Sequence, residues 1–147
     1  MIATTARNPW NSYRQIATQT APPGQLVLML YDGAIRFSER ALTGFAFTDP
    51  GERNATINNN LKRAVDIVRE LNFCLNTDAG GQLAQTLRDL YDYMERRLLE
   101  SNFKKNRAGV DEVIVHLKEL RNAWATMLAN QGRPPLETSD RSEWQTA

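Results

Sequence analysis

The chain has 147 residues, and its 18 Lys and Arg residues against 17 Asp and Glu residues give a formal net charge of +1 at pH 7. This balance argues against a dedicated nucleic-acid binder, which needs an excess of basic side chains to neutralise phosphates, and against a polybasic membrane-binding patch. The length fits one ordinary domain, which can bury a hydrophobic core without a metal ion or a disulfide.

The sequence shows no signal for crossing or entering a membrane. Residues 1–10 lack the apolar centre of a secretory signal, and no stretch approaches the ~18 consecutive apolar residues of a membrane span. Cys74 is the one cysteine in the sequence, so no intramolecular disulfide can form, which is consistent with a reducing compartment. We therefore expect a protein of the cytoplasm (the cytosol), with no membrane insertion.

Proline and glycine divide the chain into four long segments. The main breaks fall near residues 22–23, 49–51, 78–81 and 132–135, with a weaker one at 106–109. The apolar spacing between breaks predicts four helices, near residues 22–46, 50–76, 80–104 and 108–130. Short loops between helices of similar length are typical of antiparallel neighbours. The sequence therefore predicts an all-α fold, an antiparallel four-helix bundle.

We expect three parts along the chain. Residues 1–21 form a short N-terminal cap, helical or extended, residues 22–131 form the bundle, and residues 132–147 form a flexible, polar C-terminal tail. Asp49 and Asn106 are the expected N-caps of the second and fourth helices, because a short polar side chain can accept a hydrogen bond from a free N–H of the first turn.

The N-terminal segment contains one amphipathic turn. Trp10, Tyr13 and Ile16 recur at intervals of three residues. This turn either packs permanently against the bundle or forms a movable cap over an apolar groove. Aromatic side chains commonly anchor interfaces, so Trp10 and Tyr13 are candidate partner-binding residues.

The first helix has more apolar surface than one buried face requires. At 100° per residue, one stripe predicts core residues Leu26, Leu30, Ala34, Phe37 and Ala41. A second stripe on nearly the opposite side contains Leu28, Tyr31, Ile35 and Leu42. Either the helix packs between two layers of its own protein, or the second stripe is a docking surface for an incoming helix. The second explanation makes these four residues candidate partner-binding residues.

Each later helix has one predicted core stripe. In the second helix the stripe is Ile57, Leu61, Ala64, Val68, Leu71 and Leu75. In the third it is Leu83, Leu87, Leu90, Tyr91, Met94 and Leu98, and in the fourth it is Val113, Leu117, Leu120, Trp124 and Met127. Leu99 and Phe103 lie far around the third helix from its stripe. They either pack under a terminal segment or contact a partner, and we include them as candidate partner-binding residues.

The sequence contains no recognisable catalytic or metal-binding motif. His116 is the one histidine, and Cys74 lies within another predicted helix, where we expect a small core or boundary residue. A di-iron bundle needs a Glu-x-x-His motif from each of two helices, which one histidine cannot supply. No phosphate-binding loop or dinucleotide motif occurs. We expect no enzyme activity, cofactor or metal.

A histidine-phosphotransfer domain is the alternative function. Such domains are also four-helix bundles with a reactive histidine on a helix, and His116 would be that residue. Their histidine needs small neighbours so that a partner can approach, whereas Glu119 and Leu120 occupy those positions here.

Four motifs in series resemble the flagellar secretion chaperone family, the flagellin-specific export chaperones. The first is APPGQLVLMLYDGAI at residues 21–35, and the second is KRAVDIVRELN at residues 62–72. The third joins Gly80-Gly81 to LYDYMERRLLESN at residues 90–102, and the fourth spans residues 112–124. Tyr13 lies where the family has an N-terminal aromatic residue.

This resemblance implies a function. The family binds the C-terminal segment of flagellin, which is disordered before assembly. The resemblance therefore implies a cytoplasmic chaperone that prevents premature polymerisation and assists delivery to the flagellar type III export apparatus. It implies a monomer or weak homodimer with flagellin and components of the export apparatus as partners, and no cofactor, nucleic acid or metal.

Overall fold

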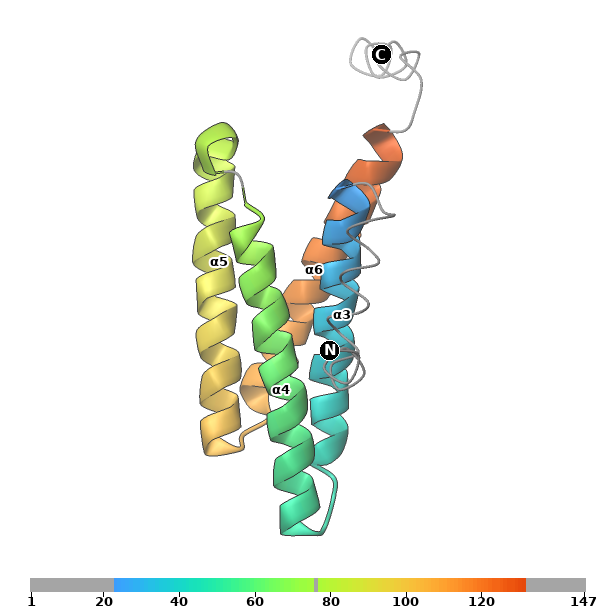
Figure 1. The fold of residues 1–147 in the computed structure, drawn as a ribbon, viewed down its shortest axis with the longest axis vertical. Helices are drawn as coiled ribbons and strands as arrows, with labels where there is room; N and C mark the ends of the chain where they lie inside the picture. The colour runs from blue at the N-terminus through green and yellow to red at the C-terminus, as the bar shows by residue number, and fades with distance from the viewer. Residues whose placement is uncertain (1–22, 76, 132–147) are drawn as a thin grey trace, which may run out of the picture.

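The structure, a computed structural model, describes residues 23–75 and 77–131 and contains four helices (Figure 1). They are α3 (Pro23–Gly44), α4 (Pro50–Phe73), α5 (Thr77–Lys104) and α6 (Ala108–Gln131). The predicted all-α fold is confirmed, and each predicted helix lies within a few residues of an observed one. The expected N-terminal cap and C-terminal tail lie outside the described residues.

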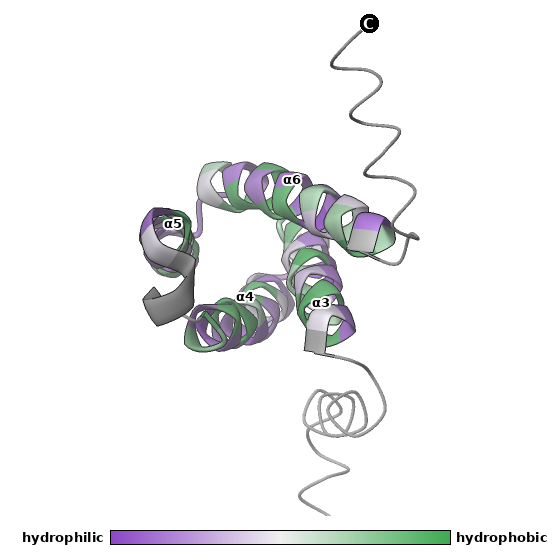
Figure 2. Cartoon of the chain, turned by 90° about the horizontal axis from the view of Figure 1, so that it is seen from above, coloured by the Kyte–Doolittle hydropathy of each residue, from purple (hydrophilic) through white to green (hydrophobic). Residues whose placement is uncertain are grey.

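Consecutive helices run antiparallel and surround a common core (Figure 2). Helix α3 contacts α4 and α6, and α5 contacts the same two helices from the other side. The diagonal pairs, α3 with α5 and α4 with α6, have no close backbone approach. This is the up-and-down order that short loops between antiparallel helices produce.

Local sequence explains where the helices begin. The Asp49 carboxylate accepts a hydrogen bond from the Glu52 backbone N–H at 2.8 Å, which confirms it as the N-cap of α4. The Asn106 side chain accepts one from the Ala108 N–H at 2.8 Å, at the start of α6. Helix α5 has one break in its first turns, because Gly81 adopts φ 57° and ψ −130°. Only glycine visits this backbone region readily.

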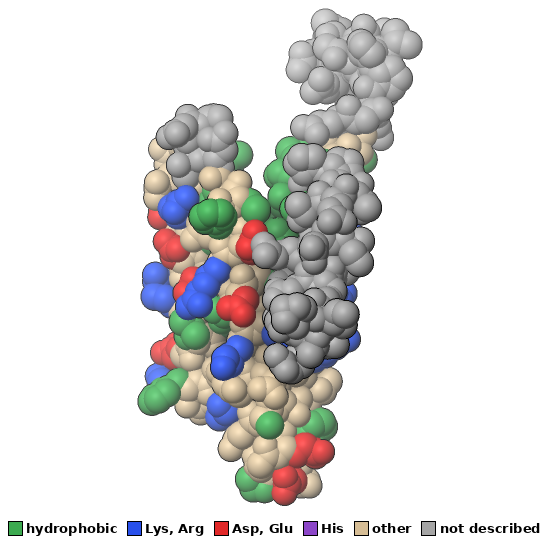
Figure 3. All heavy atoms as spheres, viewed as in Figure 1, with side chains coloured by type: hydrophobic (Ala, Val, Ile, Leu, Met, Phe, Trp, Pro, Cys, Tyr) green, Lys and Arg blue, Asp and Glu red, His purple; other side chains and the backbone are tan. Residues whose placement is uncertain are grey.

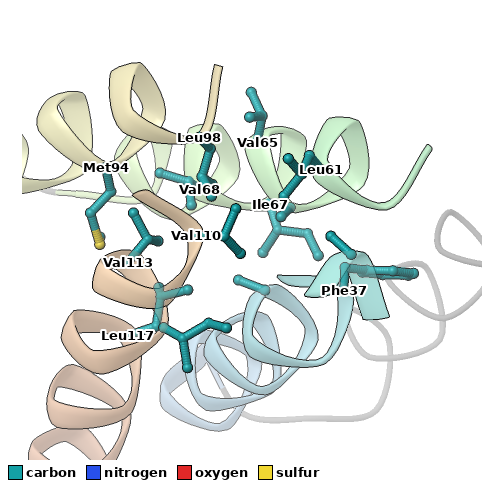
Figure 4. Close-up of a cluster of buried hydrophobic side chains, with 14 of the residues drawn as sticks. Phe37, Leu61, Val65, Ile67, Val68, Met94, Leu98, Val110, Val113 and Leu117 are labelled. Carbon is teal, nitrogen blue, oxygen red and sulfur yellow. The ribbon is translucent and has the colours of Figure 1, made fainter. Parts of the chain in front are cut away.

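The core draws side chains from all four helices (Figure 4). Most predicted core residues are buried or packed against the buried cluster. Among those that are fully buried are Leu30, Ala34, Ile57, Leu61, Ala64, Met94, Leu98, Val113 and Leu117. The prediction of a core position is wrong for two residues, because Leu83 is 69% exposed and Met127 is 36% exposed.

The reason for these two corrections is a divergence of the helices. Helices α3 and α6 form one arm, α4 and α5 form the other, and the arms separate toward the N-terminal ends of α3 and α5 (Figure 1). Leu83 and Met127 lie in that region, on the ends of α5 and α6. The residues of an apolar stripe are buried only along the length over which another helix packs against them.

Cys74 also differs from its expected position. It caps the C-terminus of α4 and is exposed, so it is not a core residue. Among the described helices, none combines the length and hydropathy that spanning a membrane requires.

Adjacent leucines of α5 provide a test of this packing. Leu98 is fully buried, whereas Leu99 is 43% exposed. Leu98→Ala should lower the free energy of unfolding by ~2–5 kcal/mol because it leaves a cavity. Leu99→Ala, the same chemical change one residue away, should shift it by no more than ~0.5 kcal/mol. Urea titrations followed by circular dichroism measure both, and equal losses would contradict the packing of α5.

Candidate functional site

The space between the two arms is an apolar cleft. Figure 3 shows a hollow between the arms, with hydrophobic side chains along its walls. Partly buried side chains of α3, α5 and α6, with Leu75 just after α4, pack against the core at this end: Leu26, Val27, Leu75, Leu87, Leu90, Leu120 and Trp124. Leu83 extends the α5 wall and is largely exposed. We call this set of residues the cleft.

Polar contacts join α3 and α6 beside the cleft. The Trp124 indole N–H donates to the Gly24 carbonyl at 2.8 Å. A Cβ at Gly24 would lie 2.6 Å from Leu128 Cδ2, so a larger residue there would require the Leu128 side chain to shift. The Asp32 carboxylate pairs with Arg121 at 2.9 Å. These contacts fix one wall of the cleft.

The arm formed by α4 and α5 has its own polar contacts. Asn72 Nδ2 donates to the Asp92 carboxylate at 2.9 Å, and Arg69 pairs with Glu95 at 2.9 Å. Both contacts lie near the cleft end of the two helices. Each wall is therefore a packed helix pair, and the cleft lies between two preformed surfaces.

Two buried tyrosines join α3 to α5 inside the bundle. The hydroxyls of Tyr31 on α3 and Tyr91 on α5 hydrogen bond to each other, and each residue is 2% exposed. This contact joins two diagonal helices whose backbones do not approach closely. Desolvation by burial raises the pKa of both hydroxyls above their ordinary value, so both stay neutral at physiological pH.

The opposite end of the bundle is closed by contacts between α5 and α6. Glu112 accepts a hydrogen bond from the Tyr93 hydroxyl at 2.6 Å and pairs with Arg97 at 2.9 Å. The hydrogen bond from Tyr93 lowers the pKa of Glu112, with further lowering from Arg97 and His116. Gly109 lies so close to α5 that a Cβ would lie 2.2 Å from Ser101 Oγ. The helices are therefore packed tightly at this end.

The second stripe of α3 is covered by its own protein. Tyr31 is buried, and Ile35 and Leu42 are partly buried against the core. Asp32 and Glu39, which flank the stripe, pair with Arg121 and Lys118 of α6, so the stripe faces α6. Packing between two layers of the protein therefore explains the burial of Tyr31, whereas the partner-binding role of Leu28, Ile35 and Leu42 stays a prediction.

The remaining candidate residues have different positions. Leu28 is partly buried on the same stripe. Leu99 is partly exposed and Phe103 is 88% exposed, one turn further along the outer side of α5. Trp10 and Tyr13 lie outside the described residues. Except for Val27, the cleft residues were predicted to be core residues, and no feature of the sequence indicates where the two helix pairs separate.

His116 has the surroundings of a boundary residue. Its Nε2 lies 3.3 Å from Glu112 Oε2, and its Nδ1 lies 3.9 Å from Glu119 Oε1. Carboxylates beside both ring nitrogens would repel an incoming phosphoryl group, which disfavours a phosphotransfer role. Within the described part of the chain, no three His, Cys, Asp or Glu side chains are grouped so as to hold a metal ion.

Comparisons with known proteins agree on one family. A family model described as Flagellar protein FliS matches residues 6–131. The flagellar secretion chaperone FliS of Bacillus subtilis is 36% identical over 125 residues, covering 85% of this chain and 90% of that protein. The protein of that name from Vibrio cholerae is 32% identical over 123 residues, which cover 80% of this chain and 87% of that protein. The protein of that name from Salmonella typhimurium is 36% identical over 109 residues, which cover 74% of this chain and 78% of that protein.

The tyrosine pair predicts a non-additive mutant cycle. Tyr31→Phe or Tyr91→Phe alone leaves one buried hydroxyl without a partner, and each should cost ~1–3 kcal/mol of stability. The double variant removes both hydroxyls, so it should cost clearly less than the sum of the two. Chemical denaturation of the four proteins measures this coupling, and additive losses would show that the hydroxyls do not interact.

The carboxylate of Glu112 predicts an acid-dependent loss of stability. The pKa of Glu112 is lower in the folded protein than in the unfolded chain. Its carboxylate therefore stabilises the fold above about pH 4.3, the ordinary pKa of Glu. This stabilisation is lost as the pH falls through the pKa that Glu112 has in the folded protein. Glu112→Gln should therefore lower the melting temperature at pH 7, with a smaller difference from the unaltered protein at pH 3. The exposed Glu119→Gln serves as the control. A difference that stays constant with pH would exclude this role.

Proposed function

Because this chain belongs to the FliS family of flagellar secretion chaperones, as its sequence motifs predicted, we propose that it binds the C-terminal segment of flagellin in the apolar cleft. It thereby keeps flagellin from polymerising prematurely in the cytosol and assists delivery to the flagellar type III export apparatus. The observation that supports this most directly is the cleft itself, an apolar hollow between two packed helix pairs (Figure 3).

The chemistry of the cleft suits a disordered protein partner. Its walls are leucine, valine and tryptophan side chains, with no catalytic group among them. An amphipathic helix can place apolar side chains at i, i+3, i+4 and i+7 into such a groove. The entropy lost when a disordered segment becomes ordered is offset by apolar area buried along the cleft. Because the walls are already packed, the chaperone itself loses little freedom on binding.

A second contact surface is proposed on the outer side of α5. Leu99 and Phe103 are exposed one turn apart, and they are too far around the helix to line the cleft. A disordered client can wrap around a bundle and use separate apolar surfaces. We propose that the cleft is the main site, that Leu99 and Phe103 form a secondary one, and that Trp10 and Tyr13 also contact the client.

Charge introduced into the cleft should separate binding from folding. Leu83→Asp places a charge on the α5 wall, and Leu83 is mostly exposed in the free protein, so the melting temperature should change little. The affinity for the flagellin C-terminal segment should fall tenfold or more, which corresponds to ~1.4 kcal/mol or more. Isothermal titration calorimetry with that segment measures the dissociation constant.

The matched control is Val115→Asp. Val115 is 56% exposed on the outer face of α6, away from the cleft, so the same charge there should leave the affinity unchanged. Flagellin that lacks its C-terminal segment should not bind either variant. If Leu83→Asp binds normally and Leu99→Ser with Phe103→Ser does not, the main docking surface is the outer side of α5.

A further inference from the structure

Three arginine side chains surround the ring of Phe37, which α3 contributes beside α4. The guanidinium carbons of Arg36, Arg40 and Arg63 lie 6.0, 5.5 and 5.6 Å from the centroid of that ring. The ring is 7% exposed, whereas Arg36 and Arg40 are exposed and Arg63 is partly buried. Three cations from two helices therefore gather over one buried ring, and we call them the arginine cluster.

The arginine cluster has no acidic partner within the chain that the structure describes. None of its guanidiniums forms an ion pair or donates a hydrogen bond to a described residue. The carboxylates that flank the cluster on α3 and α4 pair with other cations: Asp32 with Arg121, Glu39 with Lys118, and Asp66 with Arg69. The positive charge of the cluster is therefore not neutralised by these neighbours.

Packing against an aromatic ring does not by itself require three arginines. At Phe45 a single arginine, Arg53, lies 5.5 Å from the ring centroid, and its Nε donates to the Phe45 carbonyl at 3.4 Å. That guanidinium stacks on a ring and uses a donor within the chain. At Phe37 three guanidiniums share one ring, where their charges repel one another, and their N–H donors stay available to a ligand.

The spacing of the cluster favours a ligand with several carboxylates. Guanidiniums bind carboxylates through paired, charged hydrogen bonds, and clusters of arginine are a common means of recognising acidic motifs. Arg36 and Arg40 lie one turn apart on α3, an interval that places Cβ atoms about 5–6 Å apart. Carboxylates one turn apart on an acidic helix have the same spacing. The cluster therefore matches an acidic polypeptide.

An anionic membrane or a nucleic acid fits the cluster less well. Binding to either increases with the number of basic side chains on one surface, and here Lys62 adds only one more cation beside Arg63. Glu39 and Asp66 flank the cluster, so an extended anionic surface would also meet their carboxylates. A short acidic segment can contact the arginines alone.

We propose that the arginine cluster binds an acidic segment of a second protein partner. The cluster lies around Phe37, in the C-terminal half of α3, whereas the cleft opens toward the N-terminal end of that helix (Figure 1). A client in the cleft and an acidic partner on the cluster can therefore be bound together. This site is separate from the proposed binding of flagellin and does not depend on it.

A decaglutamate peptide tests the site in the full chain. In a nuclear magnetic resonance titration, the Nε–Hε signals of Arg36, Arg40 and Arg63 should shift more than those of the other arginines. A decaglutamine peptide should shift none of them. The shifts should shrink as salt is added, because the contact is between exposed charges. This titration uses the unaltered protein, so its result does not depend on whether a variant folds.

Paired variants then test the clustering itself. Arg36→Gln with Arg40→Gln should weaken decaglutamate binding at least tenfold by fluorescence anisotropy, while Arg36→Lys with Arg40→Lys should lose less, since the charge is kept. The matched control is Arg88→Gln with Arg96→Gln, which removes the same charge from α5. These two arginines also lack an ion pair among the described residues, but they do not share a ring, so their loss should leave the affinity unchanged.

Several results would overturn the proposal. The decaglutamate peptide could leave the three arginine signals unmoved, or both glutamine pairs could weaken binding equally, which would indicate unspecific attraction. Tighter binding of phosphatidylserine vesicles or single-stranded DNA to the cluster would assign it to another class of ligand. Displacement of the peptide by the flagellin C-terminal segment would make the cluster part of the client site. If that segment does not bind at all while the peptide does, the proposed function fails and the arginine site stands.

Discussion

The contact between Tyr31 and Tyr91 divides this bundle into two different halves. It joins α3 to α5 across the diagonal, where the helix backbones do not meet, and the two buried hydroxyls hydrogen bond to each other. Toward the C-terminal ends of α3 and α5, the four helices pack around a continuous core. Toward their N-terminal ends, the two arms diverge and the cleft opens between them (Figure 1). A buried polar pair of this kind is stable only while both partners are present, so it constrains how far the two arms can separate.

The two ends of the bundle show how small residues control helix separation. At the closed end, Gly109 lets α6 approach α5 until its backbone lies against Ser101. At the open end, Gly24 lets α6 approach α3 instead, where Trp124 donates to the Gly24 carbonyl. Helix α6 therefore starts close to α5 and ends close to α3. This change of neighbour leaves the wall of α5 uncovered near Leu83 and creates the cleft.

The arrangement suits a protein that binds an unfolded client and must release it. Rigid walls keep the apolar surface available without a folding step in the chaperone, and the polar contacts of each arm lie outside the cleft. An exposed apolar surface of this kind also favours self-association of the protein while no client is bound.

The sequence alone determined the number, length and order of the helices, their caps at Asp49 and Asn106, and most of the core, because these depend on local spacing and on the chemistry of single residues. It also identified the family from four motifs in series. It could not show that Tyr31 is buried while Leu83 is exposed, since both lie on apolar stripes of equal quality. A residue on such a stripe is buried only where a second helix packs against it. The tertiary structure decides this, because α6 lies close to α5 at Gly109 and close to α3 at Gly24. Phe73, by contrast, is exposed because it lies outside the buried stripe of α4, as its spacing from Leu71 already indicates.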